Sequence, residues 1–207
     1  MNDVLARIRE DKIVAVLRAE TADALMTLAK ALRDGGLGCL EFTMTTPGAL
    51  DTLKAATQEL GESVLLGAGT VLDRETARAA ILAGARFLVS PCLRAEVLTM
   101  GKRYGVPVMP GAFTPGEVLA AWEAGADVVK VFPAGRLGPD YLKDLHGPFP
   151  QIALMPTGGI SPDDAAAYLK AGAVAVGLGG NLTRLAPGES PATLTERARR
   201  LMDSLRS

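Results

Sequence analysis

A lysine inside an apolar strand is the first residue whose position suggests chemistry. Residues 128–132 read VVKVF, a β-branched and apolar run with turn residues on both sides, which predicts a short buried strand around Lys130. A buried ammonium group is costly unless it is paired or gives up its proton, and the neutral amine is a nucleophile that forms imines. Lys130 is therefore a candidate Schiff-base residue. The alternative is a lysine held in a structural ion pair.

The segment CLEFT, residues 39–43, places a second charge within an apolar strand. Side chains alternate between the two faces of a strand, so Glu41 lies on the face opposite Leu40 and Phe42. A carboxyl group and an amine at comparable depth could neutralise each other structurally. They could equally act as a nucleophile and its proton-transfer partner.

Two pairs of glycines follow the last two predicted strands. Residues 156–162 read PTGGISP, and residues 177–182 read GLGGNL. Glycines at these places are typical of the phosphate site of an α/β barrel, because backbone N–H groups without side chains can approach an anion closely. The expected phosphate ligands are the amides of Gly158, Gly159, Gly179 and Gly180. Tight turns between strands and helices are the alternative use of these glycines.

Three further strand ends offer groups or space for a ligand. Arg18 ends the first predicted strand, and its planar guanidinium can donate to two oxygens of a carboxylate or phosphate. A salt bridge at the rim is the alternative. The third strand ends in GAGT at residues 67–70 and the fourth in SPC at residues 90–92, where small side chains leave room for a ligand or simply satisfy packing.

Composition excludes several other classes of protein. The chain has 207 residues, a formal net charge of -1 and no basic tract, which argues against nucleic acid or a membrane surface as its main partner. No apolar run reaches membrane-spanning length and the N-terminus is unlike a signal peptide, so we expect a cytoplasmic protein. Two cysteines without metal spacing and one histidine, His146 in a predicted surface loop, argue against a metal site. We expect no cofactor.

Ala-Gly-Ala repeats indicate the fold. The tripeptide recurs at residues 83–85, 124–126 and 171–173, each time between a helical pattern and an apolar strand. The copies lie about 40 to 48 residues apart, which is two strand–helix units each. Alternating strands and helices give a parallel sheet, and eight units most simply close into a (β/α)8 TIM barrel. The alternative, an open doubly wound sheet, is disfavoured because no GxGxxG fingerprint follows the first strand.

We expect one domain over residues 1–207, without an internal linker and with a short helix at residues 2–9 before the barrel. The predicted strands cover residues 13–17, 39–43, 64–69, 87–90, 106–109, 128–132, 152–155 and 174–178. The predicted helices include residues 21–33, 47–60, 74–82, 117–123 and 163–170.

Seven motifs, in order along nearly the whole chain, together resemble one family. They are EFTMTTP, GAGTVL, SPCL, MPGAFTP, VKVFPAG, PTGGISP and GLGGNL. The chain resembles the class I aldolases for 2-keto-3-deoxy-6-phosphogluconate (KDPG) and 4-hydroxy-2-oxoglutarate. The resemblance implies a (β/α)8 barrel, usually a homotrimer. It also implies a metal-independent enzyme that cleaves a phosphorylated keto acid to pyruvate and glyceraldehyde 3-phosphate.

The resemblance implies roles for individual residues as well. Lys130 would form the Schiff base, and Glu41 would be the general acid/base. The residues that would line the pyruvyl part of the site are Thr70, Pro91 and Thr157. The four glycines named above would hold the phosphate.

Two positions depart from the family pattern. Many members carry arginine four residues after the catalytic glutamate as a carboxylate ligand, where this chain has Thr45. Many carry serine after the second glycine pair, where this chain has Asn181, whose amide could still donate to a phosphate. Relatives that lack the arginine include aldolases for the 6-phosphogalactonate analogue. We expect Arg18, on the neighbouring strand, to take over the carboxylate contact.

The sequence therefore predicts cleavage of KDPG, with the 6-phosphogalactonate analogue or 4-hydroxy-2-oxoglutarate as alternative substrates of the same chemistry. A phosphate-binding barrel isomerase or synthase would share the glycine loops but would need no inward lysine. A barrel that only binds a phosphorylated metabolite is the non-enzymatic alternative.

Overall fold

Parallel strands with helices between them form the fold, which a computed structural model describes for residues 3–206. The strands are β1 (Ile13–Leu17), β2 (Cys39–Thr43), β3 (Leu65–Gly69), β4 (Leu88–Val89), β5 (Val108–Met109), β6 (Gly111–Ala112), β7 (Val129–Val131), β8 (Leu154–Pro156) and β9 (Val176–Leu178). The helices are α1 (Asp3–Asp11), α2 (Ala22–Asp34), α3 (Ala49–Leu60), α4 (Arg74–Leu82), α5 (Ala95–Tyr104), α6 (Pro115–Glu123), α7 (Asp140–His146), α8 (Ala165–Lys170), α9 (Gly180–Thr183) and α10 (Pro191–Ser204).

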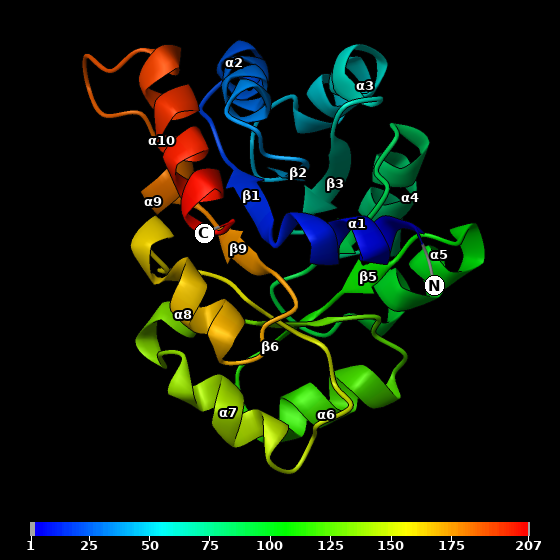
Figure 1. Ribbon diagram of the computed structural model, residues 1–207. Coiled ribbons are helices and arrows are strands. Elements are labelled where there is room, and N and C mark those ends of the chain that lie inside the picture. Colours follow the sequence, from blue (N-terminus) through cyan, green and yellow to red (C-terminus); the bar gives the residue numbers. More distant parts are fainter. Residues whose placement is uncertain (1–2, 207) are drawn as a thin grey trace.

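The strands curl around a common axis. Six of them pair in the order β5-β4-β3-β2-β1-β9 and three in the order β6-β7-β8, and the strand pairs within residues 3–206 are all parallel. A bridge between Thr157 and Gly177 connects the end of β8 to β9. In Figure 1 the helices α2 to α8 and α10 surround the strands. Because the first strand pairs with the last, the topology is that of a curled barrel sheet and not of an open doubly wound sheet.

The predicted strand at residues 106–109 is wrong in its extent. The chain forms two short strands here, β5 in one sheet and β6 in the other, with Pro110 between them. Proline has no N–H group and cannot continue a ladder of hydrogen bonds as a donor. Its carbonyl still accepts from the Lys130 N–H at 2.9 Å, so this interruption lies beside the lysine.

Most other predicted elements are present with shifted ends. β7 is shorter than the predicted residues 128–132, and β8 begins two residues later than the predicted residues 152–155. The predicted helix at 163–170 begins as a 3-10 turn, Pro162–Asp164, and continues as α8. The predicted first helix is α1, and Asn2 lies outside the described residues. No helix in residues 3–206 is both long and apolar enough to cross a membrane.

The apolar side chains form two layers, because alternation sends neighbouring strand residues to opposite faces. The outer layer lies between strands and helices and contains Leu40, Phe42, Val129 and Val131, among others. The inner layer lies within the curled sheet and contains Val14, Cys39, Phe87, Val89, Met109, Val128, Met155 and Ala175.

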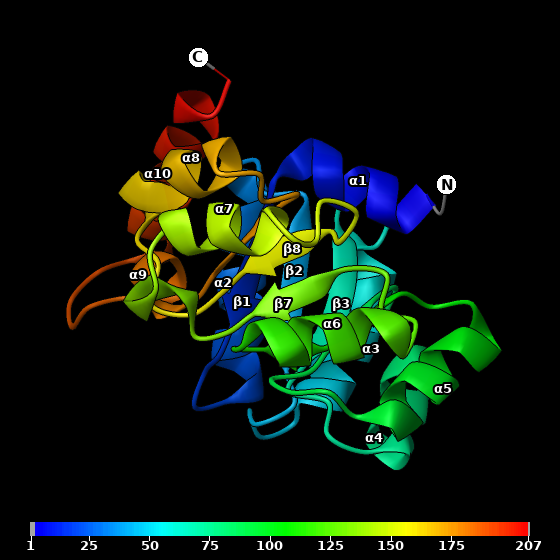
Figure 2. The same cartoon turned by 90° about the horizontal axis from the view of Figure 1, so that it is seen from below.

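Helix α1 closes one end of the inner layer. Its Val4 and Ile8 belong to the inner cluster, and Figure 2 shows the helix at one end of the strands. Next to it the Cys39 Sγ–H donates to Asp11 Oδ2 at 3.1 Å, and Arg7 Nε donates to the same oxygen at 2.7 Å. Apolar packing and this charged cluster therefore seal the amino-terminal end of the barrel, which leaves the carboxyl end for a site.

Candidate active site

A cavity of about 1140 Å³ opens where the strands end. Its wall contains Arg18 after β1, Thr43 at the end of β2 and Thr157 after β8, so it lies at the carboxyl ends of the strands. The predicted site residues on this wall are Arg18, Glu41, Thr70, Pro91, Lys130, Thr157, Gly158, Gly159, Gly179 and Gly180. Asn181 is the predicted site residue that the wall does not include.

Lys130 reaches the cavity from the middle of β7. Its neighbours in register are Gly111 on β6 and Met155 on β8, and the lysine is 6% exposed. The Nζ atom lies 4.9 Å from the centre of the Phe132 ring, and no carboxylate oxygen of residues 3–206 lies within 4.0 Å of it. The structure therefore does not hold Lys130 in a direct structural ion pair, and its amine faces the cavity.

Glu41 is the buried carboxyl group of the same cavity. The residue is 1% exposed, and its Oε2 is buried without a hydrogen-bond partner in the described part of the chain. Burial raises the pKa of Glu41, and the positive charges of Lys130 and Arg18 partly oppose that rise. A carboxyl group of this kind keeps its proton to higher pH than an ordinary glutamate and can both donate and accept it.

Gly69 on β3 makes the space for this carboxyl group. A Cβ atom at that position would lie 1.8 Å from Glu41 Oε1 and 2.4 Å from its Cδ. Gly177 on β9 leaves space in the same way for Thr157, whose Oγ1 would lie 2.2 Å from a Cβ there. These glycines are needed because a side chain on the inner face would occupy the position of a polar group.

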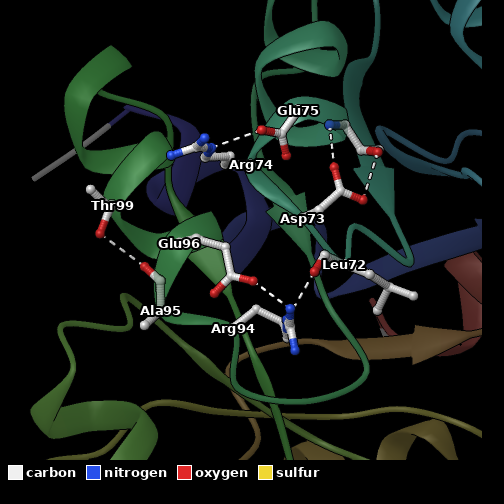
Figure 3. Close-up of polar contacts among 9 residues, drawn as sticks. Leu72, Asp73, Arg74, Glu75, Arg94, Ala95, Glu96 and Thr99 are labelled. Carbon is white, nitrogen blue, oxygen red and sulfur yellow. Dashed lines mark hydrogen bonds and ion pairs between the residues drawn. The ribbon is translucent and has the colours of Figure 1, made fainter.

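The loops that carry Thr70 and Pro91 are held together by polar contacts (Figure 3). Arg94, just before α5, donates from Nε to the Leu72 carbonyl oxygen at 2.8 Å and also pairs with Glu96. Asp73 caps α4 by accepting from the Thr76 N–H at 2.6 Å. Through these contacts the β3–α4 loop and the β4–α5 loop form one wall of the cavity.

The glycine loop after β8 presents free backbone donors. Gly158 and Gly159 have φ values of +90° and +78°, which L side chains rarely adopt. A Cβ on Gly158 would also lie 2.7 Å from the Phe132 ring. The N–H groups of both glycines donate to no acceptor in residues 3–206. Backbone amides in this state suit an anionic oxygen.

Asn181, whose amide the sequence suggests as a phosphate donor, is not part of the cavity wall. Its Nδ2 donates to the Ile160 carbonyl oxygen at 3.1 Å, so the side chain links the loop after β8 to the loop after β9. Thr45 is exposed and lies outside the cavity wall, whereas Arg18 is part of that wall.

His146 is the last residue of α7 and is half-buried, and its Nε2 lies 3.3 Å from the Ile152 carbonyl oxygen. Its prediction as a surface loop residue is therefore wrong.

Several cavity residues escape the sequence patterns. The start of α2 contributes Glu20, Thr21, Ala24, Thr27 and Leu28, and the segment after β9 contributes Thr183, Arg184 and Leu185. Their position depends on how α2 and α9 pack beside β1, and no local motif signals it. Within residues 3–206 no group of three or more His, Cys, Asp or Glu side chains could hold a metal ion.

Comparisons with known proteins find relatives over most of the chain. The family model for KDPG and KHG aldolase matches residues 4–189. A 2-dehydro-3-deoxy-phosphogluconate aldolase from Treponema pallidum is 40% identical over 81% of this chain and 78% of its own. A 2-dehydro-3-deoxy-6-phosphogalactonate aldolase from Escherichia coli K12 is 35% identical over 83% of this chain and 84% of its own.

Structural similarity extends over almost the entire chain. The crystal structure of KDPG aldolase from Legionella pneumophila, with pyruvate captured as a covalent carbinolamine, has a TM-score of 0.84 and 30% identity, covering 97% of each chain. Matched sequence, matched fold and a cavity that contains both a buried amine and a buried carboxyl group lead to one conclusion. This chain belongs to the KDPG and KHG aldolase family.

Proposed function

We propose that this protein cleaves KDPG to pyruvate and glyceraldehyde 3-phosphate through an imine on Lys130. The observation that supports it most directly is the buried Lys130 amine, which has no carboxylate partner within residues 3–206. It lies on the same cavity wall as Glu41, whose buried Oε2 has no hydrogen-bond partner in that range. The captured carbinolamine of the Legionella relative is the intermediate that such an amine would form with pyruvate.

The reaction follows from these two groups. The Lys130 amine attacks the C2 ketone and gives a carbinolamine, which loses water to become an iminium ion. Glu41, directly or through a water, removes the proton of the C4 hydroxyl group, and the C3–C4 bond breaks as its electrons pass to the iminium. The aldehyde leaves, the enamine is reprotonated, and hydrolysis releases pyruvate and the free lysine. The iminium serves as the electron sink, so the proposed steps need no metal or cofactor.

The rest of the wall binds the substrate in this proposal. Thr70, Pro91 and Thr157 contact its pyruvyl part, and the amides of Gly158, Gly159, Gly179 and Gly180 receive its phosphate. Arg18 binds the carboxylate, which is supported by its place on the wall and by its electrostatic effect on Glu41. Asn181 contributes indirectly, because its side chain joins the two glycine loops.

The 6-phosphogalactonate analogue is a second candidate substrate. The observation that favours it is Thr45, which stands exposed where many relatives have a carboxylate-binding arginine, together with the similarity to the Escherichia coli phosphogalactonate aldolase. Progress curves for the two substrates, recorded with an assay coupled to pyruvate release, rank them by kcat/KM.

We also propose a cytoplasmic homotrimer of one-domain subunits whose partner is the small phosphorylated keto acid, without a nucleic-acid or membrane partner. Each subunit contains eight strand–helix units if β5 and β6 are two parts of one barrel strand divided at Pro110. Exposed Leu72, Tyr104, Phe113 and Trp122 offer apolar surface for contacts between subunits. Sedimentation equilibrium measures the assembly directly.

Trapping the imine tests the proposed mechanism. Pyruvate with borohydride should inactivate the enzyme, and peptide mapping should find the reduced adduct on Lys130. Lys102 and Lys143 are exposed lysines of the same chain and serve as internal controls. An adduct on those residues alone, or no adduct, contradicts the covalent mechanism.

A further inference from the structure

We propose that Arg184 binds the phosphate group of the substrate, an inference that rests on the proposed aldolase function. Arg184 directly follows α9 and contributes to the cavity wall. It is exposed and forms no ion pair with any residue between 3 and 206. The donors of its guanidinium group are therefore available to an anion that enters the cavity.

The position of Arg184 places it beside the second glycine pair. A Cβ atom on Gly180 would lie 4.0 Å from Arg184 Nε, and the Arg184 N–H donates to the Gly180 carbonyl oxygen at 3.1 Å. The guanidinium group thus lies next to one of the two glycine loops that line the cavity. A phosphate held by that loop is within reach of a charge-assisted hydrogen bond from Arg184.

The other cations of the cavity wall are committed elsewhere. Lys130 supplies the amine for the imine, and Arg18 binds the carboxylate in the proposed function, while its positive charge partly opposes the rise in the pKa of Glu41. Neutral backbone amides alone leave the charge of a phosphate dianion largely uncompensated. Arg184 is the remaining positive side chain on the wall, so it balances the charge at the phosphate end of the substrate.

A half-buried ion pair, Arg197 with Glu189, fixes the backbone that carries Arg184. Arg197 on α10 donates from Nη1 to the carbonyl oxygens of Leu182 at 3.0 Å and of Arg184 at 2.8 Å. Its Nη2 donates to both carboxylate oxygens of Glu189 at 3.1 Å, and Glu189 also accepts from the Ala186 N–H at 2.7 Å. These contacts hold the segment after β9 against α10, so that the Arg184 side chain projects from a fixed point.

Glu20 provides the competing explanation. It is an acidic side chain on the same wall, and an ion pair between Glu20 and Arg184 would act as a latch over the cavity. The two residues form no ion pair in the structure. A latch would affect every substrate alike, whereas a phosphate ligand affects only phosphorylated ones, and this difference decides the experiment.

The test compares Arg184→Ala, Arg184→Lys and Arg200→Ala with the unaltered enzyme. Arg200 is an exposed arginine on α10 outside the cavity wall, so its removal controls for the loss of one positive charge. Three quantities are measured: kcat/KM for the phosphorylated substrate, the rate of deuterium exchange into the pyruvate methyl group, and the dissociation constant for inorganic phosphate from ³¹P line broadening.

Arg184→Ala should lower kcat/KM for the phosphorylated substrate on the order of 10- to 150-fold and weaken phosphate binding by a similar factor. Exchange into pyruvate should be unchanged, because pyruvate carries no phosphate. Arg184→Lys should recover part of the loss, and Arg200→Ala should change nothing. Equal losses in cleavage and in pyruvate exchange, or unchanged phosphate binding in Arg184→Ala, overturn the assignment. If the unaltered enzyme cleaves no phosphorylated sugar acid but Arg184→Ala still loses phosphate, the proposed function fails and the phosphate site stands.

Discussion

Replacing Gly69 with alanine should disable the enzyme by displacing the carboxyl group of Glu41. The added methyl group would stand 1.8 Å from Glu41 Oε1 and 2.4 Å from Cδ. Carbon and oxygen atoms in contact need about 3.5 Å, so the carboxyl group must move by roughly 1.5 to 2 Å. The Glu41 carboxyl group can make this movement because it is the far end of a flexible side chain beside an open cavity.

The expected cost follows from that displacement. A misplacement of about 1 Å at a reacting group can lower the rate about 100-fold, and complete loss of general acid/base help costs about 100- to 10,000-fold. Gly69→Ala should therefore lower kcat by a factor on the order of 100 or more. Its stability should fall by only about 1 kcal/mol, at the lower end of the cost of added core volume, because the displaced group can move into the cavity.

The assay separates the two chemical roles. Imine trapping with pyruvate and borohydride needs Lys130 and should persist in Gly69→Ala, while cleavage and proton exchange slow together. Gly67→Ala on the same strand is the matched control, since its methyl group would stand 2.3 Å from the Phe87 ring and not beside the carboxyl group. Compared with Gly69→Ala, Gly67→Ala should lower the melting temperature more and lower kcat per folded molecule less.

A double variant tests whether the loss passes through Glu41. Glu41→Gln alone should cost about 100- to 10,000-fold in kcat, and adding Gly69→Ala should cost little more, because both changes remove the same function. The reasoning is refuted if folded Gly69→Ala turns over at the rate of the unaltered enzyme. It is refuted equally if Gly69→Ala costs as much in the Glu41→Gln background as in the unaltered enzyme.

Three further outcomes are expected. Burial raises the pKa of Glu41, so the stability that this carboxyl group contributes is complete below its ordinary pKa of about 4.5 and is lost as pH rises through the folded-state pKa. The urea midpoint of Glu41→Gln should therefore rise relative to that of the unaltered protein between pH 5 and pH 8, and a constant difference between the two midpoints would argue against the buried carboxyl group. Exhaustive EDTA treatment should leave cleavage unchanged, and activity restored by zinc or magnesium would contradict the imine as the electron sink. Arg18→Lys should lower kcat/KM on the order of 10- to 150-fold with imine trapping intact and Thr45→Arg restoring part of the loss, whereas unchanged kinetics in Arg18→Lys and Arg18→Ala would place the carboxylate contact elsewhere.

Much of the site could be predicted from the sequence because strand periodicity is a local property. Lys130 and Glu41 are charges at alternating positions of short apolar strands, and this pattern alone indicates which face each occupies. The glycine pairs carry a similar local signal, and φ values of +90° and +78° at Gly158 and Gly159 explain why glycine stands there.

The parts that sequence could not predict depend on packing between distant segments. Arg184 and the residues at the start of α2 enter the cavity wall because α2 and α10 pack together and α9 lies against β1. The amide of Asn181 has an acceptor on another loop, the Ile160 carbonyl oxygen, which spacing along the chain does not reveal. The sequence does not predict the short strand β6 beyond Pro110, because only the pairing of β5 and β6 with different sheets reveals it.

Because α1 closes one end of the barrel, the rate at which the two cysteines are modified can report how often that end opens. Cys39 is fully buried under α1, and burial raises the pKa of its thiol, whereas Cys92 is exposed. A thiol reagent should thus modify Cys92 at once and Cys39 only when α1 separates from the strands. The urea dependence of the slow phase then reports how much of the chain opens: a shallow slope means that α1 detaches alone, and a slope equal to the global m-value means that α1 separates only when the whole barrel unfolds.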